Sequence, residues 1–154
     1  MCLILDANLA SRAFGVPTHE DFLAIIDWLT SDKKDGKLVV GGQLATELNK
    51  VTAARRFVRA LQQAGRARLI PEQEANTEAA KIQGSCLSND AHVIALARVS
   101  GARILCARDK RLHQDFGNPI LISNPKGHVY QTQQHVLLLS KFGHTVACRR
   151  ILQA

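Results

Sequence analysis

Short apolar runs alternate with amphipathic segments along the chain, and this alternation limits the possible folds more than any other feature. Each run is rich in Leu, Ile and Val and is nearly continuously apolar, which is typical of parallel strands covered on both faces. Parallel strands are joined by right-handed crossovers, here through the segments between the runs. We therefore expect an α/β domain with a parallel sheet. The expected strands are Cys2 to Leu5, Lys37 to Val40, Ala67 to Ile70, Arg103 to Cys106 and Ile120 to Ile122.

Three segments between these runs have helical periodicity. In THEDFLAIIDWLTS the apolar residues share one face, and Thr18 stands at the N-cap position. QLATELNKVTAARRFVRALQQAG predicts one long helix from about Gln43 to Ala64 that ends at Gly65. NDAHVIALARVSG predicts a helix that ends at Gly101. Further along, SNPKGHVYQ is interpreted as a loop and TQQHVLLLSKF as a short amphipathic helix, whereas HTVACRRILQA has no clear assignment.

The length of 154 residues suits one ordinary domain with its own hydrophobic core. No apolar stretch approaches the roughly 20 residues of a membrane span, and the N-terminus does not resemble a signal peptide. We therefore expect a cytoplasmic protein with no membrane contact. The four cysteines form no CxxC pair, which suggests neither a zinc knuckle nor a disulfide framework, and we interpret them mostly as small core residues.

The positive charge is concentrated in the second half of the chain. Residues 1 to 78 hold ten Lys or Arg and ten Asp or Glu, whereas residues 79 to 154 hold ten Lys or Arg and three Asp, a difference of +7. Such an excess favours a polyanionic partner, most often nucleic acid, because neutralised phosphates release counterions. Solubility alone is the other explanation.

Four carboxylates stand at positions that can face one edge of the sheet. Asp6 ends the first apolar run and Asp109 follows the fourth, so the two are neighbours if these strands are adjacent. Glu47 lies near the start of the long helix, and Asp90 opens the helix that leads to the fourth strand. An acidic cluster with oxygen ligands alone is the ligand set that Mg²⁺ and Mn²⁺ prefer. With such ions bound, a site of this kind can cleave phosphodiesters.

Each carboxylate also has a simpler explanation. Asp90 can favour the positive end of a helix dipole, Glu47 can be an exposed helix residue, and Asp109 can belong to a turn. Asp6 is the hardest to explain in this way, because strands are depleted in Asp and the apolar residues before Asp6 leave its carboxylate little access to water. The joint arrangement therefore carries more weight than any single residue.

The segments LILDAN, ATELNK, NDAHVIALA and ILCARDKRLHQDF together resemble the signature of PIN-domain ribonucleases over about residues 2 to 123. The resemblance implies a three-layer α/β/α domain with a five-stranded parallel sheet in the order 3-2-1-4-5. It assigns residues 1 to 124 to the nuclease domain, with residues 125 to 154 as a C-terminal extension that we expect to pack on the same domain.

The resemblance also implies an Mg²⁺- or Mn²⁺-dependent endoribonuclease. Asp6, Glu47, Asp90 and Asp109 would be its catalytic metal ligands, Asn8 would orient ligands or water, and Asp115 would be a supplementary acid. One position departs from the family, which often has Thr, Ser or Asn where this chain has Ala107. The loss of that hydrogen bond affects metal occupancy or rate.

Many compact PIN proteins are VapC-like toxins of toxin–antitoxin pairs. The resemblance therefore implies an RNA substrate, an antitoxin partner and a homodimer, although PIN nucleases with other roles have a similar size. Of the basic residues beside Asp109, namely Arg108, Lys110 and Arg111, we expect at least one to contact an RNA phosphate. The alternative for these three is a solvated turn.

Other groups leave several interpretations open. Arg55, Arg56 and Arg59 fit a phosphate-binding surface, an antitoxin-binding surface or plain surface charge, and His92 fits a capping or surface role better than a place in the cleft. The absence of GxGxxG and GxxxxGK motifs disfavours a dinucleotide or P-loop site. A receiver-like signalling module is disfavoured because ARLIPEQE offers no Asp at the end of the third strand. A catalytically impaired PIN-like RNA-binding or regulatory module is the remaining alternative.

Overall fold

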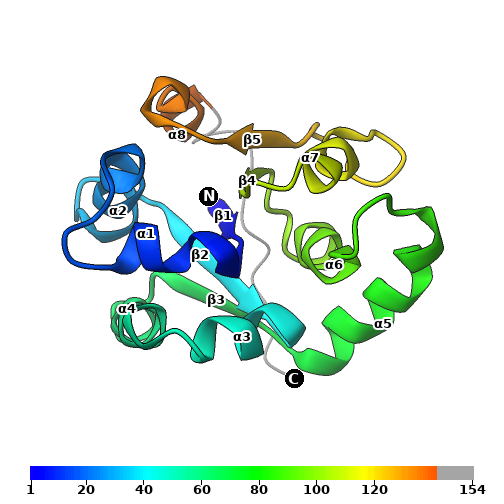
Figure 1. Ribbon diagram of the computed structural model, residues 1–154, viewed down its shortest axis with the longest axis horizontal. Helices are drawn as coiled ribbons and strands as arrows, with labels where there is room; N and C mark the ends of the chain where they lie inside the picture. Colours follow the sequence, from blue (N-terminus) through cyan, green and yellow to red (C-terminus); the bar gives the residue numbers. More distant parts are fainter. Residues whose placement is uncertain (142–154) are drawn as a thin grey trace.

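The computed structural model describes residues 1–141 of the chain. Its centre is a parallel five-stranded sheet in the order β3-β2-β1-β4-β5, which confirms the expected order. The strands are β1 (Cys2–Leu5), β2 (Lys37–Gly41), β3 (Ala67–Ile70), β4 (Ile104–Cys106) and β5 (His128–Tyr130). Helices cover both faces of the sheet, so the domain has three layers (Figure 1). None of the helices in residues 1–141 is long and apolar enough to span a membrane.

Helices α5, α6 and α7 lie on one side of the sheet, and α1, α2 and α4 lie on the other (Figure 1). The helices are α1 (Ala10–Phe14), α2 (Leu23–Thr30), α3 (Gly42–Asn49), α4 (Thr52–Gln63), α5 (Glu72–Ile82), α6 (Ala91–Ser100), α7 (Lys110–Gly117) and α8 (Leu138–Lys141). Short 3-10 helices occupy Ala7–Leu9, Glu20–Phe22, Gln83–Ser85 and Gln133–His135. The layers bury the central strands completely, and all four residues of β1 are inaccessible to solvent.

Two details of the expected helices are wrong. The N-cap of the 3-10 turn that leads into α2 is His19, whose Nδ1 accepts a hydrogen bond from Asp21 N, whereas the hydroxyl of Thr18 donates to Gly15 O. The long helix is also interrupted, because Val51 has extended backbone between α3 and α4. Its end at Gly65 is confirmed, with φ +71° at the glycine and Arg66 N donating to Leu61 O at 2.7 Å.

The fifth strand is not where the apolar run predicts it. Residues 120–122 form a turn, and the strand is His128–Tyr130, inside the segment interpreted as a loop. Two arginines donate hydrogen bonds to carbonyl groups of the turn. Arg98 Nη1 donates to Leu121 O at 2.7 Å, and Arg103 Nη2 donates to Ser123 O at 3.1 Å. These bonds satisfy backbone groups that a strand would have paired in the sheet.

Residues beyond position 124 therefore contribute to the sheet, although the C-terminal extension was expected to begin there. The helix expected in TQQHVLLLSKF is present as a 3-10 turn and the short α8. The HTVACRRILQA segment lies outside the described residues. Cys106 and Cys86 are free thiols, whereas the buried Cys2 is disulfide-bonded, which the cysteine spacing did not predict.

Gly127 offers a test of how tightly β5 packs on α7. A Cβ atom at this position would lie 2.6 Å from Phe116 Cδ1 and closer still to Phe116 O. We expect Gly127→Ala to lower the free energy of unfolding by roughly 1 to 3 kcal/mol, measured by urea denaturation. Gly117→Ala is the matched control, because a Cβ there meets nothing within 4 Å. Equal stability of the two variants would contradict this packing.

Candidate functional site

The carboxyl ends of the strands carry the four expected carboxylates. Asp6 follows β1 directly, and Asp6 N donates to Cys106 O at 2.8 Å, which ties the end of β1 to the end of β4. Glu47 is on α3, which follows β2, and Asp90 precedes α6. Asp109 precedes α7, just beyond β4. Strands β1 and β4 are adjacent, which was the condition for Asp6 and Asp109 to be neighbours.

Asp6 is a buried acid, with only 4% of its surface exposed. Burial raises the pKa of Asp6, and the charges of Asp90 and Glu47 raise it further. Asn8 Nδ2 lies 3.5 Å from Asp6 Oδ2, which is a long and weak hydrogen bond. Asp6, Asp90 and Glu47 thus form one electrostatic group, and Asn8 supports it.

Asp90 links this group to the fourth acid. Burial raises the pKa of Asp90, His92 opposes the rise, and the charges of Asp109 and Glu47 add to it. All four predicted acids therefore interact through Asp90. Neighbouring carboxylates that are partly withdrawn from water repel one another, so an ionised cluster needs a compensating cation.

His92 lies inside this cluster, contrary to the capping or surface role that its sequence position favoured. Its ring is buried, and His92 Nε2 is 3.6 Å from Glu47 Oε2 with no hydrogen-bond partner in residues 1–141. The other carboxylate oxygen of Glu47 accepts a hydrogen bond from Gln43 Nε2 at 2.9 Å. The sequence around His92 could not predict this contact, because Glu47 lies on a helix that is distant in the chain.

Asp109 differs from the other acids because it is exposed and caps its own helix. Its Oδ1 accepts hydrogen bonds from Arg111 N at 2.8 Å and Leu112 N at 3.4 Å. Oδ2 has no hydrogen bond to the part of the chain that the structure describes. The turn interpretation of Asp109 is therefore compatible with a site role, since one oxygen serves the helix and the other is available.

Asp115 is engaged by the fold. It is buried, and its two oxygens accept hydrogen bonds from Leu87 N at 2.8 Å and Ser88 N at 2.9 Å. Ser88 Oγ in turn accepts from Asp90 N at 3.2 Å. Asp115 therefore holds the loop that positions Asp90, which gives it an indirect connection to the site.

The residue at the family's usual Thr, Ser or Asn position is Ala107, which is buried. Its carbonyl oxygen is 2.6 Å from His113 Nε2, a geometry in which the imidazole N–H donates. His113 thus anchors the backbone two residues before Asp109. Arg108, Lys110 and Arg111 are exposed beside it, and their side chains make no hydrogen bond or ion pair within residues 1–141.

A metal ion would fit the chemistry of this edge. No three His, Cys, Asp or Glu side chains of residues 1–141 are already gathered around a common point. However, Mg²⁺ usually binds through one or two carboxylates, waters and substrate phosphates rather than a complete protein cage. The negative charge of Asp90 and Glu47 around the buried Asp6, and the buried His92 Nε2 that has no hydrogen bond in residues 1–141, fit the chemistry of a divalent-cation site.

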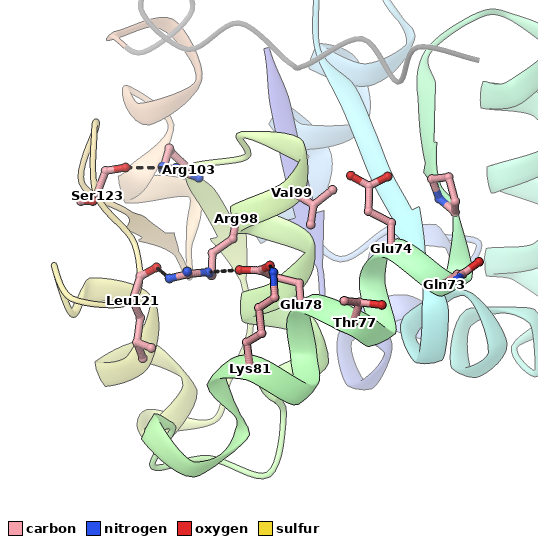
Figure 2. A pocket seen from close by; sticks show the side chains of 11 residues that line it. Gln73, Glu74, Thr77, Glu78, Lys81, Arg98, Val99, Arg103, Leu121 and Ser123 are labelled. Carbon is pink, nitrogen blue, oxygen red and sulfur yellow. Dashed lines mark hydrogen bonds and ion pairs between the residues drawn. The ribbon is translucent and has the colours of Figure 1, made fainter. Parts of the chain in front are cut away.

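A cavity lies elsewhere in residues 1–141, between α5, α6 and the turn at 121–123 (Figure 2). It has a volume of about 700 Å³, but its main charged groups pair with one another. Glu78 bonds to Arg98 Nε at 2.7 Å and lies 3.5 Å from Lys81 Nζ. Neither the four acids nor their neighbours in the chain line it, so this cavity is separate from the acidic edge.

The fold and its edge define an α/β/α domain with a carboxylate cluster where parallel sheets bind ligands. The sequence model of the PIN domain matches residues 3–116. The chain belongs to the PIN-domain family, whose members are generally nucleases that use divalent metals. No match to the chain is found among curated proteins or among solved structures.

The raised pKa of Asp6 predicts a pH-dependent cost to stability. A carboxyl group whose pKa is higher in the folded than in the unfolded state binds protons better when folded. Its stabilising contribution is complete below the unfolded value and is lost as pH rises through the folded value. We therefore expect metal-free Asp6→Asn to melt at a higher temperature than the wild type at pH 7, and at a similar one at pH 3.

The matched control is Asp32→Asn, an exposed residue without a side-chain partner in residues 1–141. It should melt like the wild type at both pH values. An Asp6→Asn variant that is less stable than the wild type at pH 7 would contradict the repulsion described above.

Asp115 supports a second stability prediction. Asp115→Ala leaves Leu87 N and Ser88 N without their charged acceptor, so we expect a loss of about 3 kcal/mol in urea denaturation. Amide hydrogen exchange at these two residues should become faster. Asp32→Ala should change the unfolding free energy by no more than about 0.5 kcal/mol. Unchanged exchange at Leu87 and Ser88 would show that Asp115 does not hold this loop.

Proposed function

We propose that the protein is a divalent-metal-dependent endoribonuclease that hydrolyses RNA phosphodiester bonds at the acidic edge, with Mg²⁺ or Mn²⁺ as cofactor. The observation that carries this proposal is the coupling of the buried Asp6 to Asp90 and Glu47. A structural role does not account for this coupling, because repulsion between the ionised carboxylates destabilises the folded state. Membership of the PIN-domain family supports the same assignment.

In this proposal the four carboxylates have different roles in metal binding. Asp6 and Asp90 are the principal ligands, and Glu47 and Asp109 complete the site. A bound divalent ion would supply Lewis-acid stabilisation and a water of lowered pKa. Asn8 steadies the Asp6 carboxylate, Gln43 fixes one oxygen of Glu47, and the buried strand behind Asp6 keeps bulk water from that side.

The RNA would approach over the basic residues beside Asp109. Arg108, Lys110 and Arg111 are exposed and have no competing partner in residues 1–141. Cations next to a metal site attract the phosphate backbone and neutralise it on contact. Their position supports at least one phosphate contact adjacent to the scissile bond.

We further propose that the enzyme is a VapC-like toxin, restrained by an antitoxin protein and active as a homodimer. The resemblance of its motifs and its compact length support this assignment. Induced expression should arrest growth, and co-expression of a small protein encoded beside it should relieve the arrest. Growth that continues normally with active enzyme present would contradict the toxin role.

A catalytically impaired RNA-binding or regulatory module is the second candidate, and Ala107 favours it. The missing hydroxyl or amide at this position removes a hydrogen bond next to Asp109. The bond from His113 to Ala107 O fixes the backbone at this position, but it does not replace the missing side-chain hydrogen bond to a metal ligand. This candidate predicts RNA binding without turnover.

Cleavage of labelled RNA distinguishes the two candidates. We expect hydrolysis with Mn²⁺ or Mg²⁺, none with excess EDTA, and a rate at least about 100-fold lower in Asp6→Asn. Mn²⁺ should also raise the melting temperature of the wild type and have a much smaller effect on Asp6→Asn. Asp32→Asn should cleave at the wild-type rate. Cleavage that persists in Asp6→Asn would refute this assignment of the site.

A further inference from the structure

A smaller cavity lies at the same edge of the sheet, and Ala107 and Arg108, the two residues before Asp109, are part of its lining. Its volume is about 250 Å³, below the roughly 300 to 1,000 Å³ of sites that enclose a whole small molecule. Its lining comes from the segments that follow β1, β4 and β5 and from the 3-10 turn Glu20–Phe22 before α2. The polar members are Arg12, Asp21, Arg108, His113, Gln131 and Thr132.

The walls of this cavity are fixed by hydrogen bonds between distant segments. Tyr130 OH donates to Asp21 O at 2.8 Å, and Gln133 N donates to Asp21 Oδ1 at 3.2 Å. These bonds attach the end of β5 to the 3-10 turn Glu20–Phe22, which precedes α2. On the opposite wall, the bond between His113 and Ala107 O fixes the backbone that carries Arg108. The cavity is thus preorganised, which lowers the entropic cost of binding.

The charge of the cavity favours an anion. Arg12 is half-buried, and its Nη2 lies 2.8 Å from His19 Nε2, which fixes the guanidinium without neutralising it. Arg108 has no partner in residues 1–141. Asp21, the one acid among the lining residues, accepts from Gln133 N and lies 3.5 Å from His19 Nδ1, so its carboxylate is already engaged.

Two further groups offer hydrogen bonds of a different kind. The Gln131 side chain is exposed and has no partner in the described chain, and an amide can both donate and accept. Thr132 Oγ1 accepts from Gln134 N at 3.3 Å, which leaves its hydroxyl hydrogen to donate. An amide and a hydroxyl beside two guanidinium groups suit a ligand that has both a phosphate and a polar ring edge.

We propose that this cavity binds one nucleotide of single-stranded RNA, next to the phosphodiester that is cut. Arg12 and Arg108 hold the phosphate of this nucleotide, and Gln131 and Thr132 contact the edge of its base. The proposal rests on the proposed function, because the adjacency to Asp109 gives the nucleotide its place. Single-stranded RNA is required because the base must leave its stack to enter a cavity of this size.

The affinity of the protein for short RNA oligonucleotides, measured without cleavage, tests this proposal. The protein carries Asp6→Asn to prevent cleavage, and affinity is measured against salt concentration. We expect Arg108→Gln and Arg12→Gln to weaken binding at least about tenfold each. The slope of log K against log salt should fall by about 0.7 for each lost phosphate contact. Lys33→Gln, which removes an exposed lysine outside this cavity and outside the other arginine cluster, is the matched control.

Gln131→Ala tests the base contact separately. It should change the relative affinity for oligonucleotides that differ in one base by about fivefold and leave the salt slope unchanged. Arg12→Lys should restore part of the affinity lost in Arg12→Gln, since it keeps the charge. Thermal melting identifies any variant that unfolds, and Arg108→Gln loses no hydrogen bond or ion pair within residues 1–141.

The outcomes separate this proposal from the proposed function. If the wild type cuts RNA but Arg108→Gln and Arg12→Gln bind like Lys33→Gln with the same salt slope, the nucleotide site is wrong and the nuclease stands. If the wild type does not cut RNA but both variants lose affinity as expected, the nucleotide site stands and the nuclease is wrong.

Discussion

The repulsion between the carboxylates of Asp6 and Asp90 is the constraint on which the arrangement of this edge depends. Asp6 has no freedom to move away, because the four residues before it are fully buried and Asp6 N is bonded to Cys106 O. Burial raises the pKa of both acids, and the charges of Asp90 and Glu47 raise that of Asp6 further. The protein can relieve this repulsion by protonation, through His92, or by binding a cation. Only the last also creates a place for phosphate.

The fold holds each acid by a contact that is independent of its charge partners. Gln43 holds Glu47, the backbone of α7 holds Asp109, and Asp115 holds the loop before Asp90 through Leu87 and Ser88. Fixed acids cannot separate to reduce their repulsion, so the edge remains ready for a cation. This explains why a buried group such as Asp115 is energetically important for the site without facing it.

The sequence predicted what depends on local pattern and resemblance. Strands β1 to β4 follow from continuous apolar runs, and the sheet order follows from the resemblance. The break between α3 and α4 was invisible because the apolar spacing from Leu44 to Leu61 continues without a phase change. The fifth strand was misplaced because Ile120 to Ile122 is more apolar than His128 to Tyr130. Long-range bonds from Arg98 and Arg103, which no local window contains, decide between them.

The same limit explains why Arg12, Gln131 and Thr132 were missed as candidates. Arg12 lies more than a hundred residues before Gln131 and Thr132, and the three meet only because β5 pairs with β4 and bonds to the 3-10 turn before α2. Their meeting divides the edge into an acidic part around Asp6 and a basic part beyond Asp109. A phosphate backbone that crosses both would be attracted by the second and repelled by the first until a cation is bound. In the proposed enzyme, RNA binding and metal binding would therefore reinforce each other across this boundary.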